Sequence, residues 1–168
     1  FFRKYSLTEE GRFKIDKFKM RLPAVGDLVK KIEAARFSRT LGTLIRSGVP
    51  ILQALSLVKD IIGNRVIAST MDDIRERVQK GDRLSKPLND TGFFPSLAIQ
   101  MITVGEETGK LDEMLLKVAE SYEKVVRAMV KRFISFLEPA MILVMGLLVG
   151  FIVISMLMAI FSINEIPF

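Results

Sequence analysis

The sequence predicts an all-α protein, a cytoplasmic antiparallel bundle of about six helices followed by a C-terminal transmembrane helix. Three observations support this class. Residues 139–164 form a run of 26 positions without a charge. Gly and Pro interrupt residues 27–110 at intervals typical of short helices. No segment shows the apolar–polar alternation of a half-buried strand.

The chain begins with a basic segment, residues 1–26, which we interpret as a juxtamembrane strip. Residues 1–46 hold 12 basic and 5 acidic side chains, whereas residues 47–138 hold 13 of each, so the net charge of +6 has its source in the N-terminal part. The interleaved Phe and Lys residues also fit single-stranded nucleic acid. We favour anionic lipid as the partner, and no nucleic acid, because aromatic and basic residues gather at membrane interfaces.

The bundle is predicted over residues 27–137, and its first helices are bounded by turn residues. Asp27 is expected to cap a helix that ends at Gly48, and Pro50 to open a second that stops at Gly63. Asn64 is expected to cap a third helix that continues to Gly81. Apolar residues recur at helical spacing on one face of each, and core packing is their simplest interpretation.

The later helices follow the same logic. A short helix is predicted around Ser85 to Asp90, and Pro95 opens a fifth that closes over Gly105 to Gly109. We expect the fifth helix to turn Leu97, Met101 and Val104 towards the core. A long sixth helix from Leu111 leads to the membrane segment, with the inward stripe Leu111, Leu115, Val118, Tyr122, Val125 and Met129.

The membrane helix is predicted over residues 138–164. At about 1.5 Å per residue the uncharged run spans roughly 39 Å, more than the hydrocarbon core of about 30 Å. All 25 Lys and Arg residues precede it. The bulk of the chain should therefore be cytoplasmic, and the short tail, residues 165–168, should lie outside the cytoplasm.

Composition excludes several kinds of chemistry. The chain has no Cys and no His, so it offers no thiol nucleophile, no thiolate metal site and no histidine-based triad. We expect no catalytic, cofactor-binding or metal-binding residues. The string Gly105 to Lys110 looks like a phosphate-binding loop, but it lacks one spacer residue, the hydroxyl after Lys and a preceding strand. We therefore predict no nucleotide there.

Two features remain as candidate functional residues in the bundle and at its end. The acidic turn is a candidate docking site for a basic partner surface, through Glu106, Glu107, Thr108, Gly109, Lys110 and Asp112. Glu138 and Pro139 mark a joint between the sixth helix and the membrane segment. A proline there either bends a continuing helix or opens a new one.

Within the membrane segment, Gly146 and Gly150 form a small-xxx-small pattern. Such a pattern permits close approach of another membrane helix. We therefore consider packing with a second copy or with other spans at these two glycines. The segment has no ionisable residue between its ends, which argues against an ion pathway of its own.

Several long strings resemble one known family. They are RFSRTLGTLIRSGVPILQAL (36–55), QKGDRLSKPL (79–88), FFPSLAIQMITVGEETGKLDEML (93–115) and FLEPAMILVMGLLVGFIV (136–153), preceded by TEEGRFKIDKFKMRLPAVGDLVKKI (8–32). Together they resemble the general secretion pathway protein F family, the inner-membrane platform proteins of type II secretion and type IV pilus machines. The resemblance covers nearly the whole chain.

The resemblance implies a non-enzymatic role in a bacterial inner membrane. Family members have two homologous cytoplasmic helical domains and three spans, so this chain looks like the second domain with the last span, Phe1 and Phe2 marking the exit of the span before. The implied partners are a cytoplasmic assembly ATPase, pilin-like subunits, other inner-membrane subunits and a second copy. The chain's ending looks closer to the secretion branch than to the pilus branch. A membrane-anchored signalling subunit is the alternative from another class.

Overall fold

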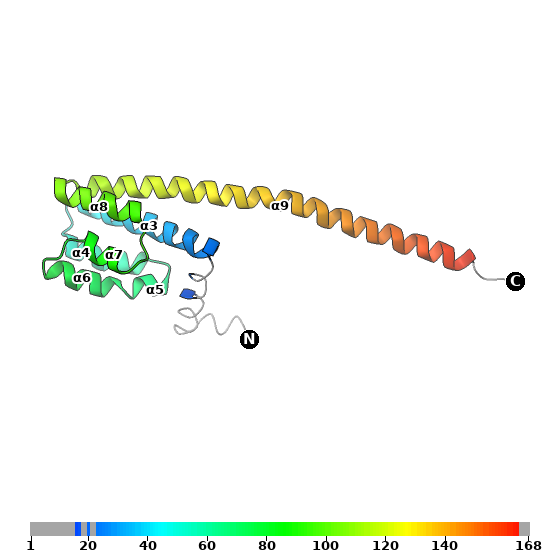
Figure 1. Ribbon diagram of the computed structural model, residues 1–168, viewed down its shortest axis with the longest axis horizontal. Helices are drawn as coiled ribbons and strands as arrows, with labels where there is room; N and C mark the ends of the chain where they lie inside the picture. Colours follow the sequence, from blue (N-terminus) through cyan, green and yellow to red (C-terminus); the bar gives the residue numbers. More distant parts are fainter. Residues whose placement is uncertain (1–15, 18–19, 21–22, 165–168) are drawn as a thin grey trace. The chain divides into compact units, whose positions relative to one another are not determined.

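The computed structural model describes residues 16–17, 20 and 23–164 (Figure 1). It divides the chain into two compact units, residues 1–127 and 128–168. The described part is helical and contains no strand, in agreement with the all-α prediction. The predicted tail and most of the predicted basic segment fall outside the described residues. The helices are α3 (Pro23–Arg46), α4 (Ile51–Ile61), α5 (Arg65–Ala68), α6 (Met71–Gln79), α7 (Ser85–Asp90), α8 (Ser96–Thr108) and α9 (Leu111–Asn164).

The helix ends confirm most of the predicted boundaries. Pro50 and Pro95 stand directly before α4 and α8, and α7 occupies the predicted short segment. Gly48, with φ at 85°, follows the end of α3 in the left-handed conformation that glycine adopts without a steric penalty. The start of α3 is the exception. The helix begins at Pro23 rather than at Asp27, as suits a proline, whose missing N–H costs nothing in a first turn.

The predicted third helix is in fact two helices, α5 and α6, separated at Ser69 and Thr70. Asn64 caps α5 as expected, because its Oδ1 accepts hydrogen bonds from the N–H groups of Val66 and Ile67 at 3.0 and 3.2 Å. The break comes from the two hydroxyl residues. Each donates a side-chain hydrogen bond of 2.8 Å to a carbonyl three residues back, in competition with the regular helical pattern.

In the first unit, α3 runs antiparallel to α4 and to the first part of α9, and α8 is also antiparallel to α9 (Figure 1). The main core lies between α3 and the helices α4 to α8. Phe37 of α3 is fully buried and meets Phe94 edge-to-face, with ring centroids 4.9 Å apart. A second cluster joins Ala35 of α3, Ala98 of α8, and Val118 and Tyr122 of α9.

The inward face of α8 differs from the predicted one by one position. Leu97 and Val104 are 51% and 48% exposed, whereas Ala98, Ile102 and Gly105 are buried. The predicted inward face was wrong for Leu97 and Val104, because small residues are needed at this contact, whereas Met101 is half-buried and packs against the second cluster. A Cβ on Gly105 would lie 2.9 Å from Cβ of Met114 and 3.0 Å from Cα of Leu111.

A second glycine, Gly42 of α3, also faces the start of α9. A Cβ there would lie 3.0 Å from Cβ of Leu115 and 3.2 Å from the carbonyl oxygen of Asp112. Side chains at either glycine would therefore push α9 away from its neighbours. The first turns of α9 pack closely against α3 and α8 because each of these helices has a glycine at the contact, Gly42 in α3 and Gly105 in α8.

The second unit contains the part of α9 from residue 128 onwards. Its described side chains are almost all exposed and, from Phe133, almost all apolar. The described helix from Leu111 to Met158 contains a window with a mean hydropathy of 2.8, so it is long and apolar enough to cross a membrane. Pro139 lies inside this helix, so the helix continues through the predicted joint. Among the described residues, no atom outside the adjoining backbone of α9 lies within 4 Å of the positions that a Cβ would take at Gly146 and Gly150.

We predict that Gly105→Ala destabilises the protein. In an open helix this change gains up to about 1 kcal/mol, but here the methyl group would overlap Met114 and the backbone of α9. Overpacking of this kind costs about 1–3 kcal/mol. Chemical denaturation of the detergent-solubilised chain, followed by circular dichroism, should show a lower midpoint. Gly146→Ala is the control and should cause no loss. A midpoint that stays the same or rises for Gly105→Ala would contradict the close contact.

Candidate functional site

The predicted acidic turn is largely helical in the structure. Glu106, Glu107 and Thr108 form the end of α8, and Asp112 lies in the first turn of α9. Only Gly109 takes a left-handed conformation, with φ at 70°. The N–H of Lys110 donates to the carbonyl of Gly105 at 2.9 Å and closes the helix end. The connection from α8 to α9 is therefore shorter than the sequence indicated, since only Gly109 and Lys110 separate the two helices. Gly105 lies inside α8 and packs against α9 instead of forming part of the turn.

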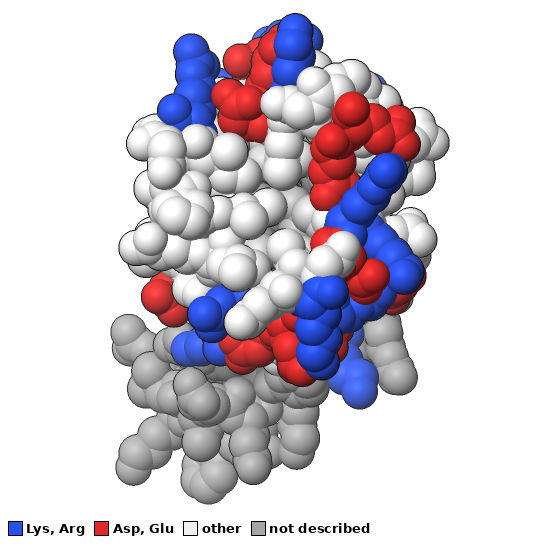
Figure 2. All heavy atoms as spheres, turned by 90° about the vertical axis from the view of Figure 1, so that its left-hand side faces the viewer, with Lys and Arg blue, Asp and Glu red and all other residues white. Residues whose placement is uncertain are grey.

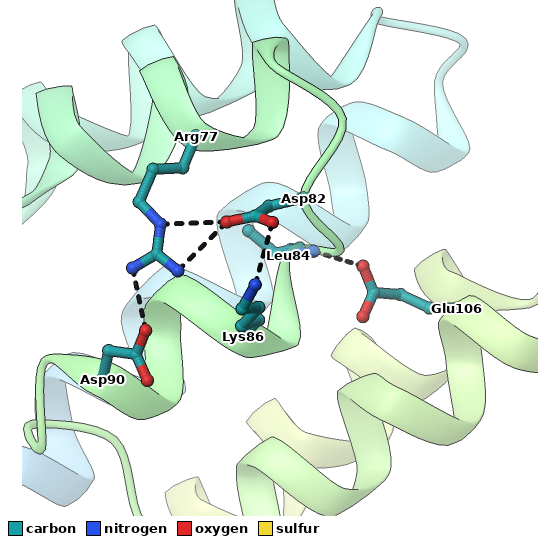
Figure 3. Close-up of polar contacts among 6 residues, drawn as sticks. All are labelled: Arg77, Asp82, Leu84, Lys86, Asp90 and Glu106. Atoms are coloured by element: carbon teal, nitrogen blue, oxygen red, sulfur yellow. Dashed lines mark hydrogen bonds and ion pairs between the residues drawn. The ribbon is translucent and has the colours of Figure 1, made fainter.

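Glu106 points into the bundle, towards the first turn of α7 (Figure 3). Its carboxylate accepts hydrogen bonds from the N–H groups of Leu84 and Ser85, the latter at 3.1 Å. These amides would otherwise have no partner at the helix start, and a carboxylate also suits the positive end of a helix. Glu106 therefore fastens α7 to α8, a long-range role that its sequence position did not reveal.

The connection between α6 and α7 is held by a set of ion pairs around Asp82 (Figure 3). Arg77 reaches Asp82 at 3.0 Å and Asp90 at 2.8 Å, and Lys86 reaches the other oxygen of Asp82 at 3.2 Å. The hydrogen bond from Lys86, followed by that from Arg77, lowers the pKa of Asp82. These charges bridge α6, α7 and the connection between them.

The outward side of the corner between α8 and α9 carries exposed charge. Glu107 forms an exposed ion pair with Arg83 at 3.1 Å, and Lys110 is also exposed. Figure 2 views this end of the bundle and shows an uncharged area beside a margin of mixed acidic and basic side chains. Among the predicted docking residues, Glu107, Thr108, Gly109 and Lys110 face solvent. Glu106 and Asp112 are half-buried.

An open groove of about 370 Å³ lies between α3 and the first part of α9. Arg39 crosses it and binds Glu123 through two hydrogen bonds, both 2.9 Å long. This bidentate pairing lowers the pKa of Glu123. The groove was not predicted from the sequence, because it depends on the spacing of two helices that are far apart in the chain. Its lining is formed by Ile32, Ala35, Arg36, Arg39, Thr40, Glu123, Val126 and Arg127.

The most buried carboxylate among the described residues is that of Glu33, 6% exposed. It accepts a hydrogen bond of 3.2 Å from the N–H of Gly63 and lies 3.6 Å from Arg36. Burial raises the pKa of Glu33, and Arg36 and the Gly63 amide oppose that rise without cancelling it. Glu33 thus holds the loop after α4 through the hydrogen bond from Gly63. A side chain at position 63 would collide with the side chains of Glu33 and Arg36.

The described residues contain no group of three or more Asp, Glu, His or Cys side chains placed to hold a metal ion. A family model for type II secretion system protein F matches residues 37–159. The chain belongs to the type II secretion system protein F family. The match includes most of the bundle and most of the apolar segment, and it confirms the resemblance seen in the sequence.

The relatives of the chain include proteins named for type IV pilus assembly and proteins named for type II secretion. The chain is 42% identical over 163 residues to a type IV pilus assembly protein PilC of Thermus thermophilus, covering 96% of this chain and 40% of that protein. It is 36% identical over 164 residues to a type II secretion system protein F of Pseudomonas aeruginosa, covering 97% of this chain and 40% of that protein. The chain thus spans about two fifths of the length of these relatives.

We predict that Glu106 and Glu107, although adjacent, differ in their contribution to stability. Glu106→Ala removes two charge-assisted hydrogen bonds to the start of α7 and should lower the free energy of unfolding by about 1–2 kcal/mol. Glu107→Ala removes one exposed ion pair and should cost no more than about 0.5 kcal/mol. Denaturant titration of both variants measures the difference. Equal losses would show that Glu106 does not cap α7.

We predict opposite pH effects for two buried or bridging carboxylates. Because the folded protein holds the Glu33 proton more tightly than the unfolded chain, the ionised form of Glu33 costs stability as pH rises above its ordinary pKa of about 4.5. Glu33→Gln should therefore gain stability relative to wild type as pH rises through that range.

Glu123→Gln is the matched control with the opposite sign. The pKa of Glu123 is lowered in the folded protein, so its carboxylate stabilises the fold above the ordinary pKa and loses that effect as pH falls through the lowered value. The variant should lose stability relative to wild type as pH rises. Urea titrations between pH 3 and pH 7 test both, and pH trends of the same sign would refute the assignments.

Proposed function

We propose that the chain is part of an inner-membrane platform protein of a type II secretion system. In this role it couples a cytoplasmic assembly ATPase to the assembly of a pilin-like filament for protein export. Membership of the family over residues 37–159 is the observation that carries the proposal. The helical unit and the apolar end of α9 supply the two parts that such a role requires, one for soluble partners and one for the bilayer.

A second candidate function is assembly of a type IV pilus. It is favoured by the identities of 42% and 40% to proteins named PilC from Thermus thermophilus and Myxococcus xanthus. The same mechanical task serves both machines, since each builds a filament from subunits that start in the membrane. We do not propose an enzymatic step. The polar interactions described in the first unit hold helices together. Glu106 of α8 binds the start of α7, Arg77 of α6 binds Asp90 of α7, and Arg39 of α3 binds Glu123 of α9.

We propose that residues 27–137 lie in the cytoplasm, that residues 138–164 span the membrane and that the C-terminus is periplasmic. Support comes from the distribution of charge: all 25 Lys and Arg residues precede the apolar segment. Glu138 and Pro139 then lie where the helix enters the bilayer. Gly146 and Gly150 expose a strip of backbone on which another span, from a second copy or another subunit, can pack closely.

We propose that the assembly ATPase docks at the corner between α8 and α9, through the solvent-facing residues Glu107, Thr108, Gly109 and Lys110. Two features favour this corner. Its structural task is carried by Glu106 and Gly105, which face inward, whereas the outward side chains face solvent and Glu107 makes only an exposed ion pair with Arg83. The corner also lies at the end of the helix that continues into the apolar segment, so a force applied there reaches α9 directly.

We predict that the charge swap Glu107→Lys with Lys110→Glu reduces co-purification of a co-expressed assembly ATPase about tenfold or more, equivalent to roughly 1.4 kcal/mol. The swap leaves the net charge and the inward contacts unchanged. The matched control swaps an exposed pair elsewhere, Glu76→Lys with Lys80→Glu on α6. Pull-down on the full-length protein is the measurement, with thermal unfolding alongside. Retained ATPase, or an equal loss in the control, would rule out this docking corner.

A separate assay tests the platform role itself. Cells lacking the full-length protein should lose filament-dependent export or piliation, and the wild-type protein should restore it. If the swap at the corner leaves this complementation intact while deletion abolishes it, the platform role stands and only the docking corner fails. If deletion affects neither export nor piliation, the proposed function is wrong.

A further inference from the structure

The groove between α3 and α9 combines an apolar floor with arginine side chains. Ile32 and Ala35 of α3 and Val126 of α9 form the apolar part. Arg36, Arg39 and Arg127 line the same groove, against one acidic residue, Glu123. A cavity of about 370 Å³ is at the lower end of the range for small-ligand sites.

Two of the three arginines have free hydrogen-bonding capacity. Arg39 uses Nε and Nη2 on the carboxylate of Glu123. Arg36 has only a loose contact of 3.6 Å with Glu33, and its side chain is 46% exposed. Arg127 is exposed and forms no ion pair within 4.0 Å with the part of the chain that the structure describes. A guanidinium group carries five N–H donors in a planar fork that matches the oxygens of a phosphate group.

The sequence after the groove is that of a membrane-facing basic segment. Between Glu123 and Glu138 there is no acidic residue, and four basic ones occur, at positions 124, 127, 131 and 132. Residues 124, 127 and 131 follow the i, i+3, i+7 spacing of one helix face. The last basic residue before the span is Arg132, and a stretch without basic residues begins at Phe133, six positions after Arg127. Basic clusters next to a span attract anionic lipid, and basic pockets there bind lipid headgroups.

We propose that this groove is a binding site for the headgroup of an anionic phospholipid. Arg36 and Arg127 hold the phosphate oxygens, and the glycerol part of the headgroup lies over Ile32, Ala35 and Val126. Arg39 is kept in place by Glu123 and borders the site. The bound lipid contacts both α3 and α9 and so bridges the two helices. The inference does not depend on the assembly role, because it rests on the groove and on the charges beside it.

The test is native mass spectrometry of the detergent-solubilised chain with phosphatidylglycerol or phosphatidylcholine. Wild type should retain phosphatidylglycerol in preference to phosphatidylcholine. Arg127→Gln should lower the affinity for phosphatidylglycerol about fivefold, the change that corresponds to about 1 kcal/mol per basic side chain near a membrane surface. Arg36→Gln with Arg127→Gln should abolish the preference. The single variant keeps the test valid if the double variant unfolds, since Arg36 also compensates the buried Glu33.

The matched control removes two exposed charges elsewhere, Arg75→Gln with Lys80→Gln, and should leave the preference unchanged. Equal retention of the two lipids by wild type, or an equal effect in the control, would overturn the proposal. Soluble glycerol phosphate that competes as well as phosphatidylglycerol would assign the groove to a free phosphate compound instead. Displacement of the lipid by an acidic peptide, with loss of that peptide's binding in Arg127→Gln, would assign it to a protein partner.

Discussion

The bundle depends on how closely α9 approaches α3 and α8. Gly42 and Gly105 face the first turns of α9, and a methyl group at either position would lie about 3 Å from the nearest atoms of α9. The second cluster continues the same contact with alanines at positions 35 and 98. Small residues at a helix contact bring backbones together and increase the number of dispersion contacts. The exposure of Leu97 and Val104 follows from this contact, because α8 turns its small residues towards α9.

The polar interactions follow from the same packing. With α8 held against α9, Glu106 is placed where it can cap the start of α7, and the ion pairs around Asp82 fix the preceding connection. On the other side of α9, Arg39 and Glu123 bridge to α3 and leave a groove with unused guanidinium donors beside it. One short corner of the chain thus has an inner side that stabilises the bundle and an outer side, Glu107 to Lys110, that is open to a partner.

Much of the fold could be predicted because its signals are local. The apolar run at 139–164, the prolines before α4 and α8 and the Asn64 cap each act within a few residues. Three of the differences from the prediction share one cause. The split between α5 and α6, the inward face of α8 and the role of Glu106 depend on hydrogen bonds or contacts that a periodic pattern does not contain. A small residue in an otherwise apolar helix, such as Gly105, was the one available signal for a close contact.

The sequence by itself determined the class of the protein. In a membrane, a 26-residue uncharged run forms a helix that satisfies its own backbone hydrogen bonds, and the lack of Cys and His removes thiol and imidazole chemistry. Only the tertiary structure decided what the charged residues do. Glu106 and Glu107 are adjacent and chemically identical, yet one caps α7 and the other faces solvent. Their difference comes from the rotation of α8 against α9, which two glycines far apart in the chain set together.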